Sequence, residues 1–139
     1  MKIKCLVLLT LALIGCVQAP RRDLYRDSPL RFEDVAEEVI ARISNGCGSA
    51  GTEAVPEFVF RSSCDRHDFY YWMGGTEEDR QRADKQFLED MRADAWATAT
   101  LWERSAYLTA AFNYYLAVRK WGKLSFHYTT QPRSWNDLP

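Results

Sequence analysis

Hydrophobic and aromatic residues recur at helical spacing in the middle of the chain, from Val59 to Trp72. If this segment is one helix, positions i, i+3, i+4 and i+7 of one face carry Cys64, His67, Asp68 and Tyr71. A thiol, an imidazole and a carboxylate on an apolar face are costly to bury unless each has a partner. The pattern therefore predicts a reaction centre or an unusual polar core.

Two further helical patterns flank this segment. Before it, Ser28-Pro29 is typical of a helix start. Apolar residues then follow at helical spacing, with acids on the other face, at Phe32, Val35, Ala36, Val39, Ile40 and Ile43. After it, Gly74-Gly75 predicts a helix end, and Thr76 with Asp79 predicts a capping box that opens a third helix.

The third helix carries an acid on its apolar stripe. Asp84 shares that stripe with Phe87 and Met91, so we expect it to face inward. A tight turn at Gly74-Gly75 would make the second and third helices antiparallel neighbours and could place Asp84 opposite His67. Asp84 would then hold one imidazole N–H and leave the other nitrogen as a base, or the pair could be structural and without chemistry.

Residues 93–120 predict one or two further helices that cover this pair. We expect the core to receive their large side chains, which are Trp96, Leu101, Trp102, Leu108, Phe112, Tyr115, Leu116 and Val118. Residues 122–139 have no helical period and are expected to follow the surface. The patterns together predict a small all-α domain over 20–139, with a core at 28–121 and an irregular tail at 122–139.

The first residues resemble a secretory signal peptide. Two lysines precede an apolar run from Cys5 to Val17, and cleavage after Ala19 would release a secreted domain without a membrane span. A second interpretation stays open, because Leu13 to Cys16 also resembles a bacterial lipobox that would leave Cys16 lipid-anchored. Arg21-Arg22 could be a processing site.

Charge and cysteine content then narrow the class of protein. Residues 1–19 carry two of the 18 Lys and Arg residues and none of the 19 acids, so the remaining domain has a net charge of −3, with no basic bias towards nucleic acid. Cys47 and Cys64 are the two cysteines that remain, and an oxidising compartment predicts one disulfide between them.

Such a disulfide would hold a glycine-rich loop over residues 44–51 close to His67 and Asp68. The Asn45 side chain and backbone carbonyls would then lie beside a carboxylate. Oxygen ligands of this kind suit a hard cation such as Ca²⁺. A zinc site at Cys64-x-x-His67 is the weaker alternative, because it needs a free thiol and more ligands than His127 supplies.

The segment Cys64-Asp65-Arg66-His67-Asp68-Phe69 resembles the C-x-R-H-D-F signature of the secreted phospholipases A2 of bacteria and fungi and of conodipine-like venom proteins. Further matches cover roughly residues 44–120, at Asn45-Gly46-Cys47, Arg82-Ala83-Asp84, 87–91 and 114–118. The resemblance implies a phospholipase A2-like fold with two antiparallel catalytic helices, a calcium loop and one disulfide.

The same resemblance implies a role for each site residue. His67 would activate water, Asp84 would orient it, and Ca²⁺ would bind Asp68, Asn45 and the Gly46 carbonyl. The substrate would be the sn-2 ester of phospholipids at a membrane or micelle surface, with peripheral membrane contact only.

The chain departs from the family pattern in three places. Many relatives have an acid in place of Asn45, cysteines near the last helices are missing, and the interval from His67 to Asp84 is slightly short. A catalytically weak or inactive binding protein or toxin subunit with the same fold is therefore the alternative function.

Overall fold

A computed structural model describes residues 30–48, 55–98 and 100–139 of the chain. The expected signal peptide, the Cys16 anchor, the Arg21-Arg22 site and the helix start at Ser28-Pro29 lie outside these residues. In the part described, four α-helices and three short 3₁₀ helices occur and no strand is formed. The predicted all-α class is confirmed.

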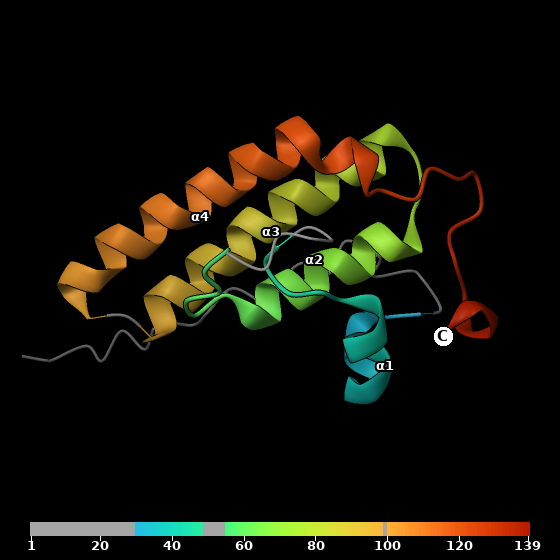
Figure 1. Ribbon diagram of the computed structural model, residues 1–139, viewed down its shortest axis with the longest axis horizontal. Coiled ribbons are helices and arrows are strands. Elements are labelled where there is room, and N and C mark those ends of the chain that lie inside the picture. Colours follow the sequence, from blue (N-terminus) through green and yellow to red (C-terminus); the bar gives the residue numbers. More distant parts are fainter. Residues whose placement is uncertain (1–29, 49–54, 99) are drawn as a thin grey trace, which may run out of the picture.

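Three long helices lie side by side and build the body of the domain (Figure 1). They are α2 (Arg61–Met73), α3 (Glu77–Thr98) and α4 (Leu101–Trp121). The middle helix, α3, runs antiparallel to both of the others and packs against each of them. A short helix, α1 (Glu37–Ile43), packs on α2.

The turn between α2 and α3 follows from its glycines. Gly74 ends α2 with a φ of 79°, which favours glycine, and a Cβ there would lie 2.2 Å from the carbonyl oxygen of His127. Thr76 opens α3, where its backbone N–H donates to Asp79 Oδ2 at 2.9 Å and its hydroxyl accepts from the Asp79 backbone N–H at 3.3 Å. The predicted capping box is therefore formed, and it makes α2 and α3 neighbours.

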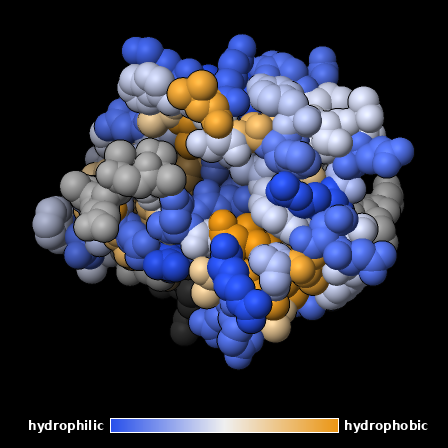
Figure 2. Space-filling model, turned by 45° about the vertical axis from the view of Figure 1, so that its right-hand side comes forward, coloured by the Kyte–Doolittle hydropathy of each residue, from blue (hydrophilic) through white to orange (hydrophobic). Residues whose placement is uncertain are grey.

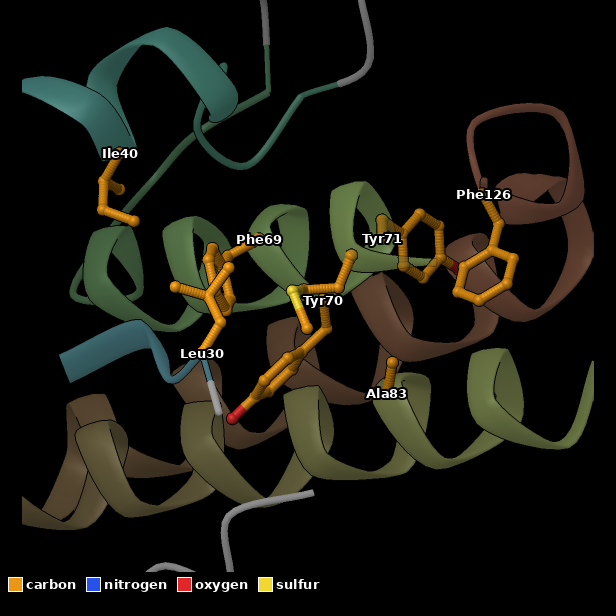
Figure 3. Packing of buried hydrophobic residues seen from close by; sticks show 8 residues of the cluster. Leu30, Ile40, Phe69, Tyr70, Tyr71, Ala83 and Phe126 are labelled. Atoms are coloured by element: carbon orange, nitrogen blue, oxygen red, sulfur yellow. The ribbon is translucent and has the colours of Figure 1, made fainter. Parts of the chain in front are cut away.

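Two apolar clusters lie on either side of α2. One joins α2 to the N-terminal segment and the C-terminal tail (Figure 3), and its buried members are Leu30, Ile40, Phe69, Tyr70, Tyr71, Met73, Ala83 and Phe126. The other lies among α2, α3 and α4, and its buried members are Phe60, Cys64, Phe87, Met91, Ala95 and Ala111. Helix α2 is therefore buried on more than the one face that its helical spacing predicted.

The expected first helix is broken in the structure. Phe32–Asp34 forms a 3₁₀ helix, and α1 begins only at Glu37, because Ala36 has an extended backbone with φ −61° and ψ 145°. Tertiary contacts explain the break. The Phe32 ring packs edge-on against Phe69 at 5.8 Å, and Glu33 pairs with Arg66 at 2.6 Å, so this segment docks on α2 instead of continuing a helix.

The prediction for the last helices was wrong in part. Helix α3 continues to Thr98, and five of the eight large side chains expected in the core are exposed: Trp96, Leu101, Trp102, Phe112 and Leu116. The fully buried residues of α3 and α4 in the second cluster include the small side chains Ala95 and Ala111, which let the two helices approach closely. Other large side chains of α4 are partly buried against this cluster, namely Tyr107, Leu108, Tyr114 and Val118.

Candidate active site

His67 of α2 faces Asp84 of α3 across the helix pair. The His67 Nε2 and Asp84 Oδ1 atoms are 3.1 Å apart, and both side chains are buried. Phe87 stacks on the imidazole at a centroid distance of 4.4 Å, while the Tyr71 ring lies on it at 4.1 Å. The ring is thus held on both sides, with Nε2 committed to Asp84.

The Asp84 carboxylate accepts hydrogen bonds from three further side chains. Tyr71 Oη donates to Oδ1 at 2.6 Å. Arg80 and Arg119 donate to Oδ2 at 2.9 and 3.2 Å. Arg80 is one helical turn before Asp84 on α3, whereas Arg119 reaches it from α4, so the carboxylate joins all three long helices.

These partners keep the carboxyl group of Asp84 ionised. Burial alone would raise the pKa of Asp84, but hydrogen bonds from His67 and Tyr71 and the charge of Arg80 outweigh it and lower the pKa below its usual value. Burial and the bond to Asp84 raise the pKa of Tyr71, so its hydroxyl remains a donor. An ionised Asp84 selects the imidazole tautomer that carries its proton on Nε2 and leaves Nδ1 as an acceptor.

The loop after α1 is tied to α2 beside this pair. Cys47 and Cys64 form the predicted disulfide, with their Cα atoms 5.0 Å apart. Ser44 Oγ donates to Asp68 Oδ2 at 3.0 Å and lies 2.5 Å from Asp65 Oδ1. The Asn45 backbone N–H also donates to Asp68 Oδ2, at 3.0 Å. The disulfide and these hydrogen bonds bring the loop against the carboxylate of Asp68.

Asp68 lies in an environment that disfavours its own charge. Burial raises its pKa to about 6, although His67 and the hydrogen bonds from Asn45 and Ser44 oppose the rise. A nearby cation would reverse this effect by favouring the ionised carboxylate.

One cleft, with a volume of about 920 Å³, is lined by the imidazole with its two ring partners, by Asp68 and by the disulfide-tied loop, whereas Asp84, Arg80 and Arg119 do not line it. His67, Asp68 and residues 44–48 lie on its wall, while Asp84 is buried behind His67. The apolar part of the wall comes from α3, α4 and the tail, through Phe87, Tyr114, Ala117, Val118, Trp121 and Phe126. A largely apolar cleft with a few convergent polar groups is the usual form of a small-molecule site.

The comparisons with known proteins give one match. The family model described as prokaryotic phospholipase A2 matches residues 30–122. The chain belongs to this family. No curated protein and no solved structure matches it. The matched residues include the whole of α2, α3 and α4, so His67, Asp68 and Asp84 of this phospholipase A2 domain lie within the family region.

The residues around Asp68 fit a calcium ion in their chemistry. In the described part of this phospholipase A2 domain, no three His, Cys, Asp or Glu side chains are grouped to hold a metal. A cation here would depend on Asp68 together with amide and carbonyl oxygens such as those of Asn45 and Gly46, which calcium accepts. Asn45 is exposed and Gly46 is buried, and both line the cleft. One acidic ligand predicts modest affinity.

Four contributors to the site were not assigned from the sequence of this phospholipase A2 domain. Arg80 was detectable, since it precedes the inward-facing Asp84 by four residues on the same helix face. Ser44 lies in the loop that was predicted to approach Asp68, but its hydrogen bond to Asp68 was not predicted. Arg119, which binds Asp84, and Arg133, which lines the cleft, come from segments with no local signal, because each meets the site only after the chain has folded.

Proposed function

We propose that this phospholipase A2 domain is a secreted, calcium-dependent enzyme that hydrolyses the sn-2 ester of glycerophospholipids to a lysophospholipid and a free fatty acid. One observation carries the proposal. An imidazole held by a buried carboxylate, His67 with Asp84, opens into the same cleft as Asp68 and the disulfide-tied loop. In this arrangement His67 would act as the base, and Asp68 with the loop would bind the cation beside it.

The proposed reaction needs no covalent enzyme intermediate. The His67 Nε2–H donates a hydrogen bond to Asp84, and the His67 Nδ1 atom accepts a proton from water. The water oxygen attacks the sn-2 carbonyl carbon, and the proton passes from Nδ1 to the glycerol oxygen as the ester C–O bond breaks. When bound by Asp68, Asn45 and Gly46, Ca²⁺ would supply the positive charge that stabilises the oxyanion.

We further propose that the partner is a phospholipid surface, contacted peripherally. No helix in the described ranges is both long and apolar enough to cross a membrane. Residues 105–118 of α4 carry no charge, yet Phe112 and Leu116 in this stretch are exposed. In Figure 2, apolar patches interrupt a mostly hydrophilic face. Exposed apolar side chains of this kind suit a lipid interface.

Secretion is the proposed destination of the domain. The sequence of residues 1–19 and the disulfide between Cys47 and Cys64 support it, because disulfides persist in oxidising compartments. The alternative of a lipid anchor at Cys16 predicts a mature chain that begins at Cys16. Mass spectrometry of the N-terminus of the exported protein separates the two.

The competing function is a phospholipase A2 fold that binds lipid with little or no turnover, which Asn45 favours because it removes one acidic ligand. Hydrolysis of dihexanoyl phosphatidylcholine, with calcium and with chelator, separates the two functions. We expect calcium-dependent release of the sn-2 fatty acid by the wild type and none by His67→Gln. A folded, calcium-loaded wild type that releases no fatty acid supports the binding protein.

A further inference from the structure

The C-terminal tail, residues 123–139, lies beyond the family match at 30–122 and yet forms part of the cleft wall. Backbone hydrogen bonds attach it to the end of α2. The His127 N–H donates to Tyr71 O at 3.2 Å, and the Arg133 N–H donates to Met73 O at 3.0 Å. Figure 1 shows the tail passing the end of α2 towards its last 3₁₀ helix, Trp135–Asp137. This wall is therefore ordered by specific contacts.

The tail makes one side of the cleft basic. Besides His67, the cleft wall contains three basic residues, Arg42 at the end of α1 and His127 and Arg133 in the tail, against the single acid Asp68. Arg42 is also joined to the tail, because its Nη1 donates to Pro139 O at 3.1 Å. Two of the three basic groups thus come from residues that the family match does not cover.

Arg133 is held in place while most of its donors remain available. Its Nη1 donates to Trp72 O at 2.6 Å, and its guanidinium lies 5.0 Å from the centre of the Trp72 ring. A guanidinium has five N–H groups, so this carbonyl takes only one of them. In the described ranges no Asp or Glu side chain forms an ion pair with Arg133 or Arg42, although Arg42 already donates to Pro139 O. Asp137 is the nearby acid, and its lowered pKa arises first from Ser134, with Arg133 the smallest contributor.

We propose that Arg133, together with Arg42 of the same cleft wall, binds the phosphate of the substrate headgroup and makes the enzyme prefer anionic over zwitterionic phospholipids. This inference depends on the proposed function for its substrate class. A guanidinium matches two phosphate oxygens at once and favours a headgroup of net negative charge. A choline headgroup brings a second cation to this basic side and gains less.

The test compares two lipids in two settings. The first is hydrolysis of dihexanoyl phosphatidylglycerol and dihexanoyl phosphatidylcholine at saturating calcium and constant ionic strength. We expect the wild type to prefer phosphatidylglycerol in kcat/KM, and Arg133→Gln to lose about tenfold on that lipid, mainly in KM. Arg133→Lys should recover part of the loss, and Arg92→Gln, which changes an exposed arginine outside the cleft, should behave as the wild type. An unchanged lipid preference in Arg133→Gln overturns the inference.

The second setting makes the inference independent of turnover. Calorimetry of His67→Gln with each lipid should show tighter binding of phosphatidylglycerol, and adding Arg133→Gln should remove the difference. If neither lipid is hydrolysed but this difference is present, the proposed function fails and the headgroup site stands. Equal binding of both lipids overturns the headgroup site.

Two further arms complete the design. Inorganic phosphate that inhibits the wild type but not Arg133→Gln, with no lipid preference in either protein, would assign the site to free phosphate and overturn the headgroup site. Thermal unfolding checks each variant, because Arg133 also holds Trp72 O. If Arg133→Gln does not fold, Arg42→Gln replaces it and should weaken the same preference, and an unchanged preference there overturns the inference.

Discussion

At the scale of single residues, Asp84 is the group on which the geometry of the site depends. Its Oδ1 accepts from His67 and Tyr71, and its Oδ2 accepts from Arg80 and Arg119. Donors on both oxygens fix the plane of the carboxylate as well as its position. The direction of the His67 ring is therefore set by a network that extends through all three long helices.

The first prediction separates the base from the residue that orients it. His67→Gln should lower kcat by about 10² to 10⁴, because the proton acceptor is lost. Its free energy of unfolding should change little, since Gln can still donate to Asp84. A cleanly folded His67→Gln that keeps more than a tenth of wild-type turnover would contradict the assignment.

Asp84→Asn should lose more stability and less activity than His67→Gln. It should lose less activity than His67→Gln, because the base itself remains. Stability should fall by about 3 kcal/mol, because the buried cation Arg80 and the partly buried Arg119 lose their shared anion. Denaturant titration and steady-state kinetics of both variants measure the two effects. A loss of activity greater than that of His67→Gln would point to Asp84 as a calcium ligand.

Asp68 predicts how stability depends on pH. Its pKa of about 6 in the folded protein exceeds the ordinary value of 3.8, so the unfolded chain loses this proton first. In chelator, stability should therefore fall as pH rises from about 4 to 7, by on the order of 2 to 3 kcal/mol. Calcium should raise the melting temperature more at pH 7.5 than at pH 5, and Asp68→Asn should remove this difference. Equal calcium effects at both pH values would exclude Asp68 as a ligand.

Part of this site could be predicted from the sequence, and the rest could not. The inward position of Asp84 and the shared face of His67 and Asp68 follow from helical periodicity, which is a local property. The hydrogen bonds from Ser44 and Arg119 depend on how α1 and α4 pack on α2 and α3. No pattern within either segment predicts such contacts.

At the scale of the elements, local signals were reliable where glycine or a cap fixes the backbone. The end of α2 at Gly74 and the start of α3 at Thr76 were predicted for this reason. The helix expected across residues 35–36 fails because Phe32 and Glu33 gain more from docking on α2 than from helical hydrogen bonds. Five large side chains of α3 and α4 were wrongly expected in the core, because apolar content alone does not identify the face that packs.

Removing the disulfide should affect both the stability of the packed elements and the calcium site. Cys47 and Cys64 are 17 residues apart, so removing the cross-link should cost about 3 kcal/mol of stability. Cys47→Ala with Cys64→Ala should also weaken calcium binding, because the loop that carries Asn45 and Gly46 is no longer tied to α2. Replacing Cys64 also removes packing. The control is therefore the unfolding of wild-type protein in reductant, which loses the disulfide but keeps both cysteine side chains. Unchanged calcium affinity in the variant would show that hydrogen bonds to Asp68 hold the loop without the disulfide.

At the scale of the whole molecule, the cleft is assembled from segments far apart in the chain. Residues 42–48, α2, α4 and the tail each supply part of its wall. The predicted irregular tail thus has a structural role, since Phe126 is buried in the core beside Tyr71, at 5.2 Å between ring centres. The polar and proline-containing sequence of the tail gives no sign of this role, because the role depends on where the turn between α2 and α3 lies.

The exposed apolar surface of α4 gives the last prediction. Leu101 and Trp102 lie at its start with exposures of 86% and 77%, and Arg104 stacks at 4.1 Å on the half-exposed Trp96. Aromatic and aliphatic side chains beside a cation suit the boundary between lipid headgroups and acyl chains. Trp102→Ala should therefore weaken binding to phospholipid vesicles by roughly ten- to a hundredfold, which corresponds to burial of one large side chain.

Trp102 does not line the cleft, so hydrolysis of a monomeric short-chain lipid should be unchanged in this variant. Vesicle sedimentation and tryptophan fluorescence measure the binding. Trp135→Ala is the control, because that tryptophan is also exposed, at 46%, but lies in the tail. Equal losses in both variants would mean that the surface adsorbs lipid without a preferred face. No loss in Trp102→Ala would place the membrane contact elsewhere, and the rim of the cleft around Trp121 would be the next surface to test.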